Sequence, residues 1–237
     1  MSKTFKSNGI VFKSLKYSET SLILDIYTQV HGLGSYIVSG VRKTKSRKAN
    51  IYHPMNILDI VAYNPSESLS RIKEARYAVT YQMLDRDVIR ASLGTYFIDL
   101  LRSSIKEKEP NKELFSYIVS QLLDLDNRDY NVRNAPIKMA VELASFLGFQ
   151  LDTNYSDEES YFDLRAGVFV AKDVSHKHVL DKETSLAIHR LLVTSFSCPL
   201  SRQLRHEVLD ALMIYYKIHI EGFHELRSLP ILRTLLS

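Results

Sequence analysis

A change of hydrophobic period near residue 80 constrains the fold of this 237-residue chain more than any other feature. Before it, Leu22, Leu24 and Ile26 alternate with other residues in the run TSLILDIYTQ, as in a strand with one buried face. After it, apolar residues recur every three to four positions, as on the buried face of a helix. The pattern predicts an α+β fold, with a β domain over residues 1–80 and a helical domain over residues 81–237.

The sequence pattern of the first domain predicts about five short strands. The run LGSYIVSGV should pair as a hairpin with the strand before the V-H-G turn, and MNILDIVAY and LSRIKEARYAV give the last two strands. A long loop separates the third strand from the fourth. Five strands with such a loop are typical of a small, partly open barrel of the OB type. An SH3-like barrel is the alternative.

The second domain shows four apolar stripes at helical spacing, beginning at Phe97, Leu114, Ile137 and Leu204. Pro136 in a first turn and Gly148 near an end suit the third of these helices. Asp181 is expected to cap a further helix that ends near Ser195.

Two segments of the second domain are not simple helices. Residues 151–180 form a polar insertion, with a small hairpin expected at YFDLRAGVFV. The leucine-rich tail from Leu226 to Leu236 is expected to dock on the helical domain, and receiving a partner is the alternative.

A basic loop at residues 39–50, SGVRKTKSRKAN, is the strongest functional signal. No Asp or Glu occurs between Asp25 and Asp59, so its cations have no acidic neighbours in sequence. Residues 1–80 carry 12 Lys and Arg against 5 Asp and Glu, a net charge of +7, whereas residues 81–237 carry 19 against 22, a net charge of −3. Such asymmetry indicates a nucleic-acid or anionic-membrane surface on the first domain. For the basic loop itself, nucleic-acid binding is favoured and a solubilising loop is the alternative.

The residues expected to contact nucleic acid combine cations for phosphates with a ring for base stacking. They are Arg42, Lys43, Lys45, Arg47 and Lys48 of the loop, Arg71 and Lys73 of the last strand, and Tyr36. Further rings considered for stacking are Tyr17, Tyr27 and Tyr52.

Signals for catalysis or metal binding are weak. The chain lacks the glycine-rich phosphate loops and the G-x-S-x-G nucleophile motif, so we expect no enzyme. The pair His176 and His178 has no thiolate partners, and the single Cys198 lies far from it in sequence, so no metal or cofactor is expected. The acidic run 157–159 suits a solvated loop.

One cysteine and the lack of a long apolar stretch predict a cytoplasmic protein without a membrane partner.

Four blocks of sequence, taken in order, resemble the bacterial RecO family of recombination mediators. They are GIVFKSLKYSETSLILDIYTQVHGLGSYIVSGVRKTKSR, HPMNILDIVAY, YFDLRAGVFV and LSRQLRHEVLDALMIYYKIHIEGFHELRSL. The first block is the specific one, because its K-Y-S-E-T turn, T-x-x-H-G turn and G-x-R-K-x-K-S-R loop occur in the family's order and spacing.

The resemblance implies an N-terminal OB-fold and a non-enzymatic protein that binds single- and double-stranded DNA and anneals complementary strands. It implies RecR and the acidic C-terminal tail of single-stranded DNA-binding protein (SSB) as partners, and loading of RecA on SSB-covered DNA in double-strand break and gap repair, near the nucleoid. The family's DNA-binding segment matches this chain at Arg42, Lys43, Lys45, Ser46 and Arg47. Many members carry a four-cysteine zinc module, but residues 151–180 hold no cysteine, so zinc is not expected.

Two other functions remain open on the residues alone. An OB-fold protein of RNA metabolism would prefer RNA, because the 2′-hydroxyl distinguishes RNA from DNA. An interaction scaffold would instead bring its basic loop to an acidic protein and ignore nucleic acid at physiological salt.

Overall fold

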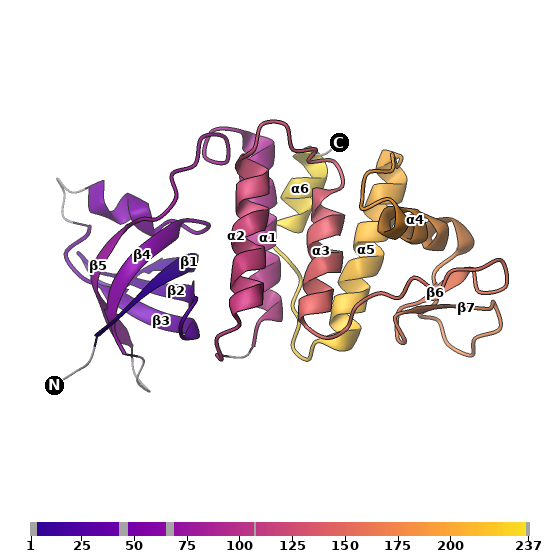
Figure 1. The fold of residues 1–237 in the computed structure, drawn as a ribbon, viewed down its shortest axis with the longest axis horizontal. Helices are drawn as coiled ribbons and strands as arrows, with labels where there is room; N and C mark the ends of the chain where they lie inside the picture. Colours follow the sequence, from indigo (N-terminus) through magenta and orange to yellow (C-terminus); the bar gives the residue numbers. More distant parts are fainter. Residues whose placement is uncertain (1–3, 43–46, 65–68, 107, 236–237) are drawn as a thin grey trace. The chain divides into compact units, whose positions relative to one another are not determined.

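The computed structural model describes residues 4–42, 47–64, 69–106 and 108–235 (Figure 1). The first part contains five strands and a short 3₁₀ helix. Their bounds are β1 Thr4–Lys16, β2 Leu22–Thr28, β3 Gly32–Val38, η1 Arg47–Tyr52, β4 Ile57–Tyr63 and β5 Ser70–Tyr77.

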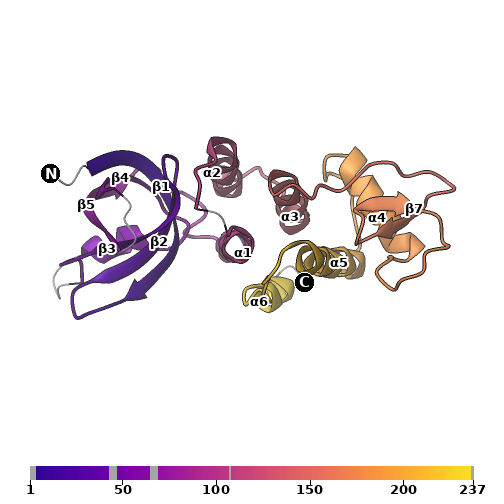
Figure 2. The same ribbon diagram turned by 90° about the horizontal axis from the view of Figure 1, so that it is seen from below.

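The five strands close into a barrel in the order β1-β2-β3-β5-β4, and Figure 2 shows them curving around a common interior. Neighbouring strands are antiparallel except β3 and β5, which run parallel and pair only at Tyr36 with Ser70 and Ile37 with Arg71. This strand order confirms the predicted OB-type barrel. Of all neighbouring strands in the barrel, β3 and β5 are joined by the fewest residue pairs, and we call this short contact the β3–β5 seam.

Strand β1 closes the barrel because it pairs with two partners. Its first half pairs with β4, from Thr4 to Ile10, and its second half pairs with β2, from Gly9 to Lys16. A register shift between Val11 and Lys13 and the glycine at position 9 allow this strand to bend. A Cβ at Gly9 would lie 2.6 Å from Cγ2 of Ile26, so the approach of β2 needs a glycine there.

The alternation read from the sequence sets the barrel core. Leu22, Leu24 and Ile26 all point inward and are at most 6% exposed, as predicted for a strand with one buried face. They pack against Leu58 and Ile60 of β4. Burial of each such side chain stabilises the fold by about 1.5–3 kcal/mol.

Six helices and a two-stranded hairpin follow within the described residues. Their bounds are α1 Val88–Ser104, α2 Lys112–Asp126, α3 Ala135–Phe146, β6 Tyr161–Asp163, β7 Val168–Val170, α4 Lys182–Val193, α5 Arg202–His219 and α6 Leu229–Leu235. The stripes predicted from Phe97, Leu114 and Ile137 are buried, and the fourth is buried from Val208 onward. As predicted, Asp181 caps α4, because its carboxylate accepts a hydrogen bond from the amide of Thr184.

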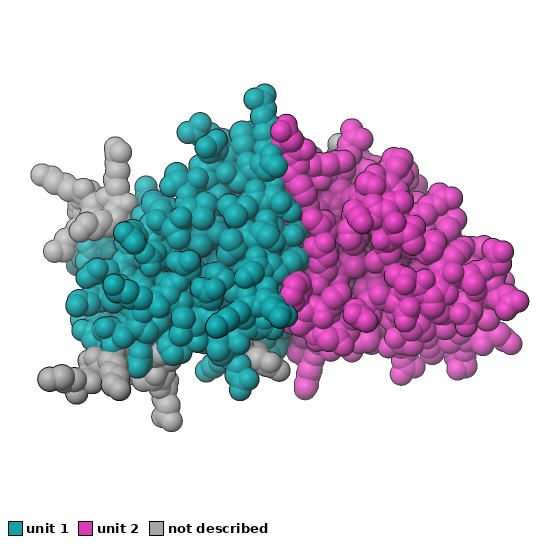
Figure 3. Space-filling model, in the orientation of Figure 1, with its two compact units in different colours: residues 1–128 teal, residues 129–237 magenta. Residues whose placement is uncertain are grey.

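The chain divides into two compact units, residues 1–128 and residues 129–237 (Figure 3). Helices α1 and α2 belong to the first unit because they pack on the barrel. The ring of Phe115 stacks on Tyr27, and the hydroxyl of Tyr81 donates to the carbonyl of Met55 at 2.8 Å. Residue 80 therefore marks the change from strands to helices, whereas the compact units divide after Arg128.

Two charged side chains hold the ends of α1 and α2 together within the first unit. The guanidinium of Arg90, 7% exposed, donates to the carbonyls of Leu125, Asn127 and Arg128 at 2.6–2.8 Å. The carboxylate of Asp126 accepts from the backbone amides of Gln82, Met83 and Leu84 at 2.7–3.1 Å. The C-terminus of α2 and the segment before α1 thus have their polar groups satisfied by each other.

The second unit contains the predicted hairpin and the predicted docked tail. Strands β6 and β7 pair antiparallel, and the amide of Phe162 donates to the hydroxyl of Ser185 in α4 at 2.9 Å. In the tail, Leu226 and Leu232 are at most 4% exposed, which confirms docking, while Leu236 lies outside the described residues.

Candidate nucleic-acid interface

The turn between β1 and β2 anchors the start of the basic loop. The amides of Val41 and Arg42 both donate to the carbonyl of Thr20, at 3.0 and 3.2 Å. The guanidinium of Arg42 donates to the carbonyl of Ser18 at 2.6 Å. The K-Y-S-E-T turn and the basic loop, which are separate motifs in sequence, are therefore one unit in space.

The end of the loop is anchored by Asn56. Its amide side chain donates to the carbonyls of Asn50 and Ile51 at 3.3 and 3.0 Å, and it is only 8% exposed. The loop thus leaves the barrel and returns to it at two points that the neighbouring strands hold in place.

A groove with a volume of about 770 Å³ opens beside these anchor points. It is lined by Val38–Val41, where the loop begins, by Ile51 and Tyr52, where η1 ends, and by residues 72–76 of β5. Lys6 of β1 with Asp59 and Val61 of β4 complete it. The groove therefore follows the barrel surface next to the sparse β3–β5 seam.

The charged residues that line the groove are Lys6, Lys73 and Arg76 with the carboxylates of Asp59 and Glu74, an excess of one positive charge (3 − 2) among the described residues. Lys6 and Lys73 are exposed, and within the described residues neither side chain has a hydrogen-bond or ion-pair partner. Arg76 is paired with Asp59, its Nη2 and Nε lying 2.6 and 2.9 Å from Oδ2. This ion pair neutralises a carboxylate that would otherwise repel a phosphate.

The residues predicted from the sequence fall into distinct positions. Lys73 lines the groove, Arg71 is exposed on the same strand outside it, and Arg42 is half-buried at the loop anchor. The backbones of Arg47 and Lys48 begin η1, and their side chains are not described. Lys43, Lys45 and Ser46 lie outside the described residues.

Tyr36 was predicted as a stacking ring, and the structure contradicts this prediction. Its side chain is 1% exposed inside the barrel core, and burial raises the pKa of its hydroxyl. Tyr27 and Tyr52, 1% and 4% exposed, are likewise unable to receive a base. Tyr17 is 62% exposed and lies next to Ser18, which accepts from Arg42.

Sequence reasoning missed Lys6 and Arg76 as groove residues. Both lie on strands whose outward face was visible from the alternation, and Arg76 continues the basic residues of β5. Alternation within a strand does not tell which outward residues of β1, β4 and β5 line the same groove. That depends on the register between the three strands in the closed barrel.

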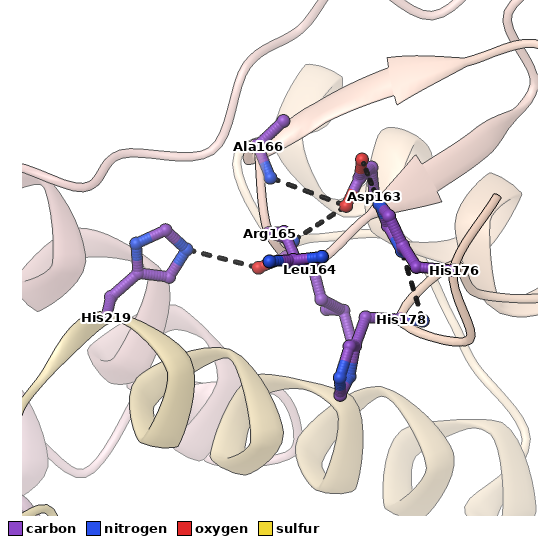
Figure 4. A network of polar contacts seen from close by, with 7 residues as sticks. All are labelled: Asp163, Leu164, Arg165, Ala166, His176, His178 and His219. Atoms are coloured by element: carbon purple, nitrogen blue, oxygen red, sulfur yellow. Dashed lines mark hydrogen bonds and ion pairs between the residues drawn. The ribbon is translucent and has the colours of Figure 1, made fainter. Parts of the chain in front are cut away.

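The insertion at residues 151–180 contains a network of polar contacts around Asp163 (Figure 4). Oδ1 of Asp163 accepts from the amides of Arg165 and Ala166 at 2.7 and 3.4 Å, and Oδ2 lies 3.3 Å from Nε2 of His176. Nδ1 of His176 accepts from the amide of His178 at 3.3 Å, so Nε2 is the ring nitrogen that faces the carboxylate.

These donor atoms make contacts within the hairpin and the segment that follows it. The described part of the chain also has no group of three or more His, Cys, Asp or Glu side chains placed to hold a metal ion. The hairpin is joined to its neighbours by further hydrogen bonds, such as that between Nε2 of His219 and the carbonyl of Leu164 at 3.1 Å (Figure 4).

The barrel topology, the anchored basic loop and the groove define an OB-fold protein with a cationic surface. Residues 1–81 match the family model described as "Recombination protein O N terminal", and residues 85–230 match "Recombination protein O C terminal". The chain therefore belongs to the RecO family, whose members act in DNA repair and recombination.

Curated relatives agree with the family models over nearly the whole chain. The DNA repair protein RecO of Flavobacterium johnsoniae is 31% identical over 240 residues, 98% of this chain and 99% of the relative. That of Phocaeicola vulgatus is 30% identical over 238 residues, again 98% and 99%. In the described ranges, no helix combines the length and the apolar character needed to cross a membrane.

Proposed function

We propose that the chain is a non-enzymatic DNA-binding recombination mediator whose barrel holds the phosphate backbone of single- and double-stranded DNA. The observation that carries the proposal is the position of the groove: the basic loop leaves and re-enters the barrel at its edge, where Lys6 and Lys73 have no partner within the described residues. Contacts of this kind are made to phosphates, so binding is largely independent of sequence.

Annealing follows from the same electrostatics. Cations that neutralise the backbone of one strand lower its repulsion for a complementary strand, so pairing is faster on the protein than in solution. Of the four tyrosines considered for stacking, all of them among the described residues, Tyr17 alone is exposed, so base stacking is expected to contribute less than phosphate contacts.

The family also supports partners for this activity. We propose that the chain acts with RecR, contacts the acidic tail of SSB and thereby promotes RecA loading on SSB-covered DNA at breaks and gaps, in the cytoplasm near the nucleoid. No metal or cofactor takes part in this proposal.

The test is binding of a labelled single-stranded oligonucleotide across a salt series. Arg42 is kept, because it anchors the loop, and Lys43, Lys45, Arg47 and Lys48 are changed to Ala. Loss of four phosphate contacts should flatten the plot of log affinity against log salt by about 3, since each contributes about 0.7 for single strands. The control replaces two exposed cations outside the groove, Arg86→Gln and Lys112→Gln, and is matched in number and chemistry to the variant Lys6→Gln with Lys73→Gln.

A second variant, Lys6→Gln with Lys73→Gln, separates the groove from the loop. It should flatten the same plot by about 1.4. Unchanged binding in both variants would refute this location. Tighter binding to an RNA oligonucleotide of the same sequence would favour RNA metabolism, and salt-independent or absent binding would favour the scaffold.

A further inference from the structure

The groove of the barrel contains a carboxylate that a surface built only to bind phosphates would not need. Asp59 of β4 lines the groove, and it is the first acidic residue after the basic loop, since no Asp or Glu occurs between Asp25 and Asp59. A negative charge at this position lowers the affinity for DNA, because it repels phosphates. Its presence in the groove therefore indicates a role other than attraction of the backbone.

The register of three neighbouring strands places Asp59 among cations. It lies on β4, between β1 and β5, and Arg76 is directly opposite on β5. Val61, two residues further along β4, is opposite both Lys6 of β1 and Glu74 of β5, so Lys6 is a diagonal neighbour of Asp59. Among the described residues, Asp59 forms its ion pair with Arg76 and none with Lys6.

The ion pair uses the donors of Arg76 that a phosphate would use. Nε and Nη2 lie 2.9 and 2.6 Å from the same oxygen, Oδ2 of Asp59. The N–H groups of these two nitrogens form one edge of the guanidinium, and such an edge binds the oxygens of a carboxylate or a phosphate side by side. The carboxylate and a DNA phosphate therefore compete for this edge.

The pair is also placed where exchange is easy. The side chain of Arg76 is 81% exposed, so a phosphate reaches the guanidinium without displacing another residue. The side chain of Asp59 is 34% exposed, so water can solvate the carboxylate once Arg76 has left it. An ion pair this close to solvent contributes little to the stability of a fold. Control of Arg76 accounts for Asp59 better than stabilisation of the barrel does.

We propose that Asp59 is an internal competitor of DNA, which occupies Arg76 in the free protein and returns to it when a strand leaves. This inference rests on the proposed function and concerns regulation of the same groove. A carboxylate tethered beside Arg76 weakens the bound state and speeds dissociation of the strand. Release of this kind frees the groove once two strands have annealed.

The test compares Asp59→Asn with the unchanged full-length protein in binding of a labelled oligothymidylate across a salt series. In the unchanged protein, a phosphate that takes Arg76 leaves the carboxylate to recruit a cation, so this contact releases no net counterion. The variant gains that release, and its plot of log affinity against log salt should steepen by about 0.7. With equal binding at about 1 M salt, this slope corresponds to about eightfold tighter binding at about 50 mM.

The matched control is Glu74→Gln, which removes the other carboxylate of the groove. In the described part of the chain, Glu74 has no ion-pair or hydrogen-bond partner, so its removal relieves repulsion but frees no cation. Binding should tighten only about twofold. A second arm repeats Asp59→Asn in a chain that also carries Arg76→Gln. There the gain should shrink from about eightfold to about twofold, because the coupling between the two residues is lost.

Stopped-flow dissociation into excess unlabelled DNA gives a second readout. Asp59→Asn should slow dissociation about eightfold, since changes within one interface act mostly on the dissociation rate. Equal gains in Asp59→Asn and Glu74→Gln, or a gain that persists with Arg76→Gln, would overturn the inference, because Asp59 would then only repel phosphates. Weaker binding in Asp59→Asn would overturn it too, since the carboxylate would then hold Arg76 in position for DNA.

The variant Lys6→Gln with Lys73→Gln distinguishes this inference from the proposed function. If that variant weakens binding while Asp59→Asn leaves binding and its salt dependence unchanged, the barrel site stands and the inference is refuted. If neither variant changes binding, DNA is held elsewhere on the chain, and both the barrel site and the role of Asp59 are refuted.

Discussion

Replacement of Arg90 by Met should destabilise the first compact unit by about 3.5–4.5 kcal/mol. Methionine keeps the apolar stem and removes the three hydrogen bonds to the C-terminus of α2. The bond to the carbonyl of Leu125 is buried and contributes about 2 kcal/mol, because its donor is charged and its acceptor would be left unsatisfied. The bonds to Asn127 and Arg128 contribute about 0.5–1 kcal/mol each, since water can replace them there. Loss of a cation at a helix C-terminus adds about 0.5 kcal/mol.

The assay is urea-induced unfolding followed by far-ultraviolet circular dichroism, with hydrogen exchange of α2 to assign the loss to this unit. The matched control is Arg86→Met, the same chemical change at an exposed position of the same unit, with an expected effect within about 0.5 kcal/mol. If Arg90→Met lies within about 1 kcal/mol of this control, water satisfies the end of α2 and the reasoning is wrong.

Two further predictions concern pH. Burial opposes ionisation of Asp126, but hydrogen bonds from the amides of residues 82–84 and the charge of Arg90 hold its pKa below the usual value. The carboxylate therefore stabilises the fold above about pH 4. This contribution is lost as the pH falls through the pKa of the folded state. The difference in unfolding free energy between the unchanged protein and Asp126→Asn should therefore shrink in acid, and a difference independent of pH would contradict this. Burial raises the pKa of Tyr52 and of Tyr215 to about 12, so the folded chain should lose stability as pH rises from about 10. An ultraviolet titration should show these tyrosines ionising late, and replacing either by Phe should remove part of the late step.

The sequence by itself determined the elements and their order. Alternation and period identified the five strands, the stripes of the longer helices and the hairpin, because a strand or helix with one buried face must repeat at its own period. Asp181 and Pro136 marked helix starts, since capping and the fixed φ of proline act within one turn. The acid-free loop was equally visible, because charge in a short segment needs no tertiary information.

Only the tertiary structure decided which residues meet. Alternation divides the side chains of β3 between two faces but does not say which face is buried. The register with β2 and the closure of the barrel decide this, and they place Tyr36 in the core. Lys6 joins Lys73 in one groove from strands far apart in the sequence. Arg133, in the turn before α3, and Arg205 of α5 likewise line one small pocket with an apolar floor. Local patterns encode what a segment becomes, whereas the position of a charge relative to another segment depends on packing of the whole unit.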